Sequence, residues 1–129
     1  MVLSNQSISK VVFSDTYNQQ KDQMDTSEVK KLEQAIYVHG YRGASKKKHN
    51  GVVPIRPSDK QLWKSLEKFK LEEKELLKTA EENYELFNSV KIVAHVTNGN
   101  RAIGIIFKTE DDKLILYLLG FSNYNYQLF

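Results

Sequence analysis

The sequence predicts an α+β fold in which an antiparallel β-meander, with an additional N-terminal strand, packs against two or three helices. Residues 90–121 hold three β-prone runs, and the breaks between them, an Asn-Gly pair and an Asp-Asp pair, are turn signals. Residues 7–13 form another short β-prone run. Residues 25–40 and 58–87 repeat apolar side chains at helical spacing, and helices there would cover the sheet.

Bulk properties restrict the class of protein. The chain has 129 residues, 40% of them hydrophobic, so we expect residues 1–129 to form a single domain with its own core. It has no cysteine, which excludes disulfides and thiolate metal sites. No apolar run is long enough to span a bilayer, and the start, MVLSNQSISK, lacks the apolar segment of a secretory signal. We therefore expect a cytoplasmic protein without a membrane partner.

The first predicted helix has clear signals at both ends. Asp25 followed by Glu28 is typical of a helix N-terminus, and Gly40 can take the left-handed conformation that ends a helix. The apolar face between them consists of Val29, Leu32 and Ile36.

The second helical segment is longer. Ser58 and Gln61 have the spacing of a capping box, and an apolar stripe follows that only Glu73 interrupts. We expect either one long helix or two helices broken near Lys70–Glu72. The stripe itself is core, and its members are Leu62, Leu66, Phe69, Leu76, Ala80, Tyr84 and Phe87.

The three meander strands are expected at Val90–Thr97, Arg101–Thr109 and Lys113–Phe121. The Asn-Gly turn would pair Val96 with Arg101, Ala94 with Ile103 and Ile92 with Ile105. The Asp-Asp turn would pair Thr109 with Leu114, Phe107 with Leu116 and Ile105 with Leu118.

This register produces two different sheet faces. One is wholly apolar and belongs under the helices. The other mixes Lys91, His95 and Lys108 with apolar residues, and we expect it to be open, either as a binding surface or as an ordinary solvent-facing side. Its apolar residues are Val93, Ile106, Ile115, Tyr117 and Phe121.

The C-terminal third carries a resemblance to a known family. It consists of NRAIGIIF from Asn100, the acidic turn Asp111-Asp112, KLILYLLGF from Lys113, and a polar, aromatic tail. This pattern, after a strand and helices, resembles the RelE/YoeB/HigB superfamily of bacterial toxins. The resemblance implies a toxin of a toxin–antitoxin system that cleaves messenger RNA without a metal, with RNA, on the ribosome or free, and a cognate antitoxin as partners.

The resemblance also implies site residues. In such cleavage the RNA's own 2′-hydroxyl attacks the phosphorus, so the enzyme must stabilise charge and move protons. Arg101 stands at the family's cationic position, and a guanidinium can bind two phosphate oxygens at once. Tyr124 and Tyr126 stand where members carry a residue for proton transfer or base stacking, and His95 is a further proton-transfer candidate. No spacing selects Glu72 or Glu73 as the general base.

Residues 41–57 read as a basic loop, YRGASKKKHNGVVPIRP. Its cations could bind a nucleic-acid backbone, or could simply be solvated. Tyr41 would offer a stacking surface beside them. The predicted RNA-binding residues are Arg42, Lys46, Lys47, Lys48, His49, Arg56, Lys91 and Lys108.

No metal or cofactor site is expected. His39, His49 and His95 lack metal-ligand spacing, and the glycines form no phosphate-binding loop.

Two other functions remain open. The chain could be a small binding protein without chemistry, such as a phage inhibitor, an immunity protein or an antitoxin. Its net charge of +3 argues against a mimic of nucleic acid. It could also be a RelE-fold toxin that acts through protein contacts, as in the family branch that poisons topoisomerase.

Overall fold

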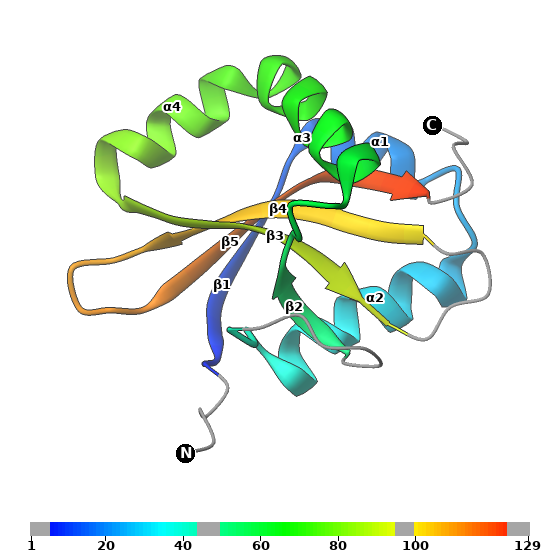
Figure 1. Cartoon of the computed structure of the whole chain (residues 1–129), viewed down its shortest axis with the longest axis horizontal. Coiled ribbons are helices and arrows are strands. Elements are labelled where there is room, and N and C mark those ends of the chain that lie inside the picture. Colours follow the sequence, from blue (N-terminus) through cyan, green and yellow to red (C-terminus); the bar gives the residue numbers. More distant parts are fainter. Residues whose placement is uncertain (1–5, 44–49, 95–99, 124–129) are drawn as a thin grey trace.

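In the computed structural model, residues 6–43, 50–94 and 100–123 are described, and they form five strands and four helices (Figure 1). In chain order these are β1 (Ile8–Phe13), α1 (Asp15–Lys21), α2 (Thr26–His39), β2 (Gly51–Pro54), α3 (Lys60–Glu72), α4 (Lys74–Asn83), β3 (Glu85–Val93), β4 (Asn100–Lys108) and β5 (Leu114–Asn123). None of the described helices is both long enough and apolar enough to cross a membrane.

The strands make one mixed sheet in the order β1-β5-β4-β3-β2. Strands β3, β4 and β5 form the antiparallel meander, and β2 extends it by pairing antiparallel with β3. At the other edge β1 lies parallel to β5. The predicted α+β class is confirmed, with a sheet that is mixed because the N-terminal strand pairs in parallel.

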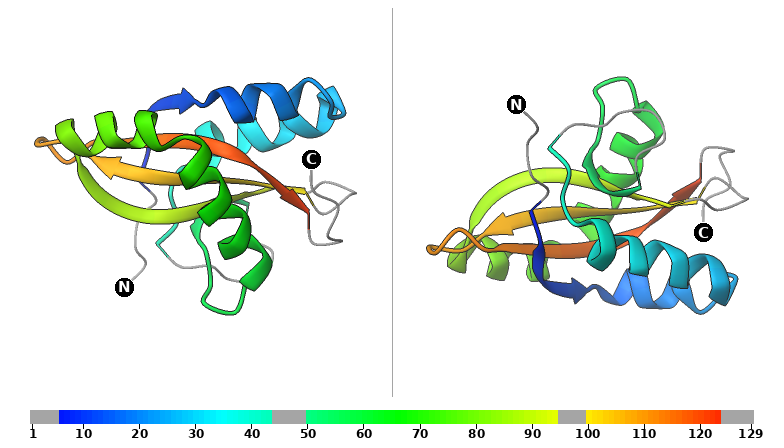
Figure 2. Two further views of the ribbon diagram at one scale, coloured as in Figure 1. Left: turned by 90° about the horizontal axis from the view of Figure 1, so that it is seen from above. Right: turned by 90° about the horizontal axis from the view of Figure 1, so that it is seen from below.

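Helices cover both faces of this sheet. Figure 2 shows α1 and α2 on one side of the strands and α3 on the other. Two separate cores result. The first joins α1 and α2 to one face through residues such as Tyr17, Leu32 and Ile36. The second joins α3 and α4 to the opposite face through Leu66 and Phe69, among others.

The prediction of an open second face is therefore wrong. Of the apolar residues assigned to that face, Ile106, Ile115 and Phe121 are all buried. The physical reason is that each helix pair has an apolar stripe that must be buried, and the two sheet faces are the surfaces available to bury them.

The predicted register of β3 on β4 is also wrong. Ile92 pairs with Ala102, not with Ile105, and Val90 pairs with Gly104. A shift by an odd number of residues moves side chains to the other face. Ile92 accordingly packs on the α2 side, while Ile103 packs on the α3 side. The Asn98-Gly99 turn lies outside the described residues.

The second hairpin differs from its prediction by one residue, since Phe107 pairs with Ile115. Its loop has three residues, because Thr109 N–H donates to Lys113 O at 2.9 Å. Asp112 closes it in the left-handed region with φ 63°. A loop of this length needs one residue of that conformation, and aspartate tolerates it better than most.

The end signals of α2 are confirmed. The Asp25 carboxylate accepts hydrogen bonds from the backbone of Ser27 and Glu28, and Gly40 ends the helix with φ 65°.

The capping box at Ser58 is not formed. Helix α3 begins instead after Asp59, whose carboxylate is engaged by Lys91.

The long helical segment is broken into two helices, which was one of the two alternatives expected from the sequence. Helix α3 ends at Glu72, α4 runs to Asn83, and residues from Glu85 onward already belong to β3. At the break, Glu73 Oε1 accepts hydrogen bonds from the backbone and hydroxyl of Thr16, at 2.9 and 2.8 Å. Helix α1, and strand β2 within the expected loop, were not predicted.

Gly104 allows β4 and β5 to approach closely at a register shift. A Cβ there would lie 2.3 Å from the Tyr117 carbonyl oxygen, whereas a Cβ on Gly43 would meet nothing within 4 Å. Gly104→Ala should therefore destabilise the fold by about 1–3 kcal/mol, the usual cost of overpacking. Urea denaturation should show a lower midpoint for Gly104→Ala and an unchanged one for Gly43→Ala. Equal midpoints for the two variants would contradict this packing.

Candidate functional site

Arg101 is the second residue of β4 and is half-buried. Its Nη1 donates to the Asn100 carbonyl at 3.0 Å, and its Cα partner on β5 is Ser122. Asn100 is anchored in turn, because its side-chain amide donates to Glu28 Oε2 of α2 at 3.0 Å. The start of β4 is thus held in place by α2, which fixes the backbone that carries Arg101.

Lys91 is not available to a ligand. It is 5% exposed, and its Nζ lies 2.8 Å from Asp59 Oδ2 at the start of α3. This ion pair, in which the lysine is buried and the aspartate partly exposed, ties the start of α3 to β3. We therefore exclude Lys91 from the proposed RNA-binding surface.

Lys108 lies at the opposite end of β4 from Arg101. Lys108 is seven positions further along the strand, which is about 23 Å at the usual rise. The ammonium lies 4.9 Å from the Phe87 ring centre and 3.8 Å from Asp112 Oδ1. Lys108 and Arg101 therefore cannot contact the same phosphate.

Two other predicted cations occupy separate positions. Arg42 donates from Nε to the Asn50 carbonyl at 2.7 Å, beside β2. Arg56 is exposed between β2 and α3, where its carbonyl accepts the Trp63 indole N–H at 2.8 Å. Arg42 lies beside Val52 of β2 and Arg56 follows β2, and β3 separates β2 from the strand that carries Arg101. The remaining predicted site residues lie outside the described part of the chain: Lys46, Lys47, Lys48, His49, His95, Tyr124 and Tyr126.

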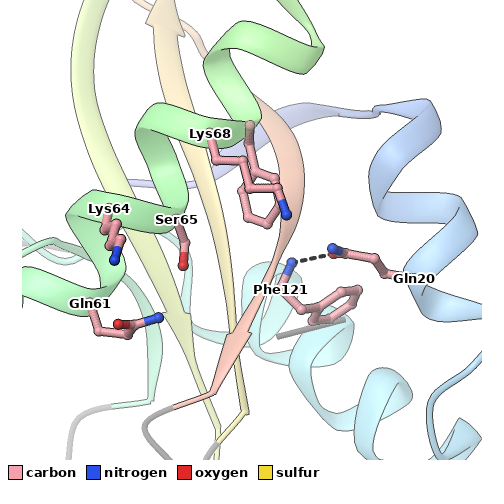
Figure 3. Close-up of a pocket in the computed structure, with 7 residues that line it drawn as sticks. Gln20, Gln61, Lys64, Ser65, Lys68 and Phe121 are labelled. Carbon is pink, nitrogen blue, oxygen red and sulfur yellow. Dashed lines mark hydrogen bonds between the residues drawn. The ribbon is translucent and has the colours of Figure 1, made fainter. Parts of the chain in front are cut away.

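A hollow that the sequence did not reveal lies between α1 and α3, beside the end of β5 (Figure 3). Its volume is about 110 Å³ and its lining is mostly apolar. We call it the α1–α3 hollow. It is lined by Gln20, Gln61, Lys64, Ser65, Lys68, Phe69 and Phe121.

Two hydrogen bonds to consecutive residues of β5 hold the walls of the hollow. On the α1 side, the Gln20 amide oxygen accepts the Phe121 N–H at 2.7 Å, as Figure 3 shows. On the α3 side, the Ser65 hydroxyl donates to the Ser122 hydroxyl at 3.0 Å. Because Ser122 pairs with Arg101 across the sheet, the hollow adjoins the strand that carries the arginine.

Aromatic packing supports the hollow from beneath. The rings of Phe121 and Tyr17 stack with centres 4.6 Å apart. Burial, followed by a hydrogen bond to Glu33, raises the pKa of the Tyr17 phenol, which therefore stays protonated at neutral pH. The Phe69 ring fits over Gly120, where a Cβ would lie 2.5 Å from the ring. The floor of the hollow is consequently rigid and uncharged.

Lysines give the hollow its charge. Lys64 and Lys68 are exposed on one face of α3, and no ion pair joins either to another described residue. The lining contains no carboxylate. Like charges four residues apart on a helix repel each other, so an anion between them would be stabilising.

A second, more polar hollow of about 430 Å³ continues along α1, sharing Gln20 and Lys68. Its other lining residues are Thr16, Gln19, Gln23 and Glu72. The sequence could not distinguish Glu72 from Glu73. Glu73 accepts two hydrogen bonds from Thr16, and Glu72, which accepts a longer one of 3.4 Å from the same hydroxyl, lines this second hollow.

The sequence did carry a signal for the α1–α3 hollow. Gln61, Lys64, Ser65 and Lys68 recur at helical spacing on the polar side of α3. A polar helix side is usually solvated, so this pattern alone does not distinguish a site.

No family model, curated protein or solved structure matches this chain. Among the described residues, no group of three or more His, Asp or Glu side chains could hold a metal ion. The function must therefore be inferred from the site itself and from the resemblance in the sequence.

The buried pair of Lys91 and Asp59 yields a prediction. Asp59→Ala would leave the Lys91 ammonium buried beside an apolar side chain and should cost about 3 kcal/mol of unfolding free energy. Adding Lys91→Met should restore much of that loss, since an apolar pair avoids the desolvation of both charges. Chemical denaturation of the two single variants and the double variant measures the coupling. Simple additivity of the two changes would show that the pair does not hold α3 on the sheet.

Proposed function

We propose that this chain is the toxin of a toxin–antitoxin system and cleaves messenger RNA without a metal, with Arg101 as its phosphate-binding residue. One observation carries the proposal. Arg101 pairs with Ser122 of β5, and Ser122 is hydrogen-bonded to Ser65 of α3, the helix whose Lys64 and Lys68 line a hollow without a carboxylate. Lysine side chains that make no ion pair with another described residue favour a polyanion.

The chemistry follows from the needs of RNA cleavage. As the 2′-hydroxyl attacks, negative charge grows on the phosphoryl oxygens, and a guanidinium held by a fixed strand can stabilise it. Anchoring of Asn100 by Glu28 supports this role, because a preorganised cation needs no rearrangement during the reaction. Proton transfer would fall to His95, Tyr124 or Tyr126. His95 follows Ala94 in the chain, and Tyr124 follows Asn123, the partner of Asn100.

A second candidate is a binding protein without chemistry, or a toxin of this fold that acts through protein contacts. Two observations favour it. Helices cover both sheet faces, which leaves no broad open face for a substrate. In addition, Tyr37 and Val38 near the end of α2 are 64% and 73% exposed, as expected of residues that meet a protein partner such as an antitoxin.

Arg101→Ala tests the first candidate. If Arg101 stabilises the transition state, the variant should relieve growth arrest in a bacterial host. It should also slow messenger-RNA cleavage by about 100- to 1000-fold, the usual effect of removing one such contact. Arg101→Lys should recover only part of the rate, since lysine keeps the charge but not the two-point geometry. Lys78→Ala on α4, an exposed cation away from the hollow, is the control and should leave both readouts unchanged.

Circular dichroism and a denaturation curve confirm that each variant is folded before its activity is compared. Full toxicity of a folded Arg101→Ala protein would reject the assignment. Growth arrest by the wild-type protein without any RNA cleavage would favour the candidate that acts through protein contacts.

A further inference from the structure

We infer that the α1–α3 hollow is a nucleotide subsite that takes one pyrimidine base of the RNA, with the attached phosphate between Lys64 and Lys68. This inference rests on the proposed function and names the part of the substrate that the chain recognises. It also gives a role to helix α3, for which the family resemblance suggests none.

The size of the hollow selects a single ring. Its volume of about 110 Å³ is somewhat below the roughly 150 Å³ of an apolar protein cavity that accommodates benzene. The hollow can therefore take in only part of one six-membered ring with its substituents left at the mouth, and it would accommodate a smaller share of a two-ring purine. Its lining is mostly apolar, and Phe69 and Phe121, which are 3% and 0% exposed, close its floor.

Two amides can read the edge of the ring. The Gln20 oxygen is occupied by the Phe121 N–H, so its NH2 group remains to donate to a base carbonyl. Gln61 lines the hollow from α3. Its side-chain amide makes no hydrogen bond to another described residue and can therefore bind a base. Side-chain amides pair with the adjacent donor and acceptor groups on the edge of a pyrimidine.

The two lysines provide the phosphate contact. In Figure 3 the Lys68 side chain extends from α3 toward Gln20 and Phe121 on the facing wall, and Lys64 lies near Gln61 on the other side of Ser65. A phosphate between the ammonium groups would offset their mutual repulsion. A base seated on the floor can thus have its phosphate at the rim.

The position of the hollow relates base recognition to cleavage. The Ser65–Ser122 hydrogen bond joins its wall to the strand pair that carries Arg101. A strand of RNA with one base in the hollow would pass its neighbouring phosphate toward the start of β4. The hollow would then set which bases flank the cleaved bond.

The test titrates the full-length wild-type protein with CMP, UMP, AMP, GMP, ribose 5-phosphate and inorganic phosphate. Amide chemical shifts and calorimetry follow the binding. We expect CMP and UMP to shift the amides of residues 61–69 and 119–122, and to bind at least tenfold tighter than ribose 5-phosphate or phosphate. AMP and GMP should bind more weakly than either pyrimidine nucleotide.

Two variants locate the contacts. Lys64→Ala/Lys68→Ala should weaken CMP binding by about tenfold or more, as expected for lost charge-assisted contacts. Lys74→Ala/Lys78→Ala is the matched control, since it removes two exposed lysines at the same spacing from α4 and should leave CMP affinity unchanged. Gln61→Leu should reduce the preference for CMP over ribose 5-phosphate while leaving the affinity for ribose 5-phosphate unchanged.

Three results would overturn the inference: no shifts in residues 61–69 and 119–122, equal affinity for phosphate and CMP, or equal losses in the two lysine pairs. Failure of the proposed function is distinguishable from these. If the protein cleaves RNA through Arg101 but CMP does not perturb the hollow, the toxin proposal stands and the subsite is rejected. If CMP binds as described but RNA is never cleaved, the subsite stands and the nuclease is rejected.

Discussion

Strand β1 ends before its neighbour β5 does, so the last residues of β5 have no strand to pair with on that side. The rest of the structure depends on the hydrogen bonds that α1 supplies to them instead. The pairing of β1 with β5 stops at Leu118. Beyond it, the Ser14 hydroxyl donates to the Leu119 carbonyl at 3.0 Å, and the Gln20 amide accepts the Phe121 N–H. An edge strand with unpaired polar groups is otherwise costly when buried. Helix α1 thus completes the sheet edge and forms one wall of the hollow.

The two helix layers determine where a ligand can bind. With both sheet faces buried, recognition is confined to the ends and edges of the sheet. Ser65 and Phe121 belong to different elements, yet α3 and the end of β5 bring them to one hollow. The buried pair of Lys91 and Asp59 holds the start of α3 on β3, which in turn positions the lysines of that helix. Stability and the candidate site therefore share the same contacts.

Local signals in the sequence predicted much of the fold, but not its register or its site. Asp25 and Gly40 act through adjacent backbone, so α2 could be predicted from its ends. The strand register could not, because both sheet faces are apolar and alternation no longer identifies one register. The hollow could not either, since it needs Gln20 and Ser65, which are far apart in sequence. Arg101 was identified only through the family resemblance. The residues around it could not be predicted, because tertiary packing brings them there.

Photo-crosslinking tests most directly the central claim that RNA binds where α1, α3 and the end of β5 meet. The wild-type protein would be irradiated with a short RNA that carries 4-thiouridine, a pyrimidine, and the attached peptides identified by mass spectrometry. If RNA binds there, crosslinks should concentrate in residues 61–69 and 119–123, and excess CMP should suppress them. Crosslinks concentrated instead on α4 or on the hairpin around Lys108, and insensitive to CMP, would contradict it.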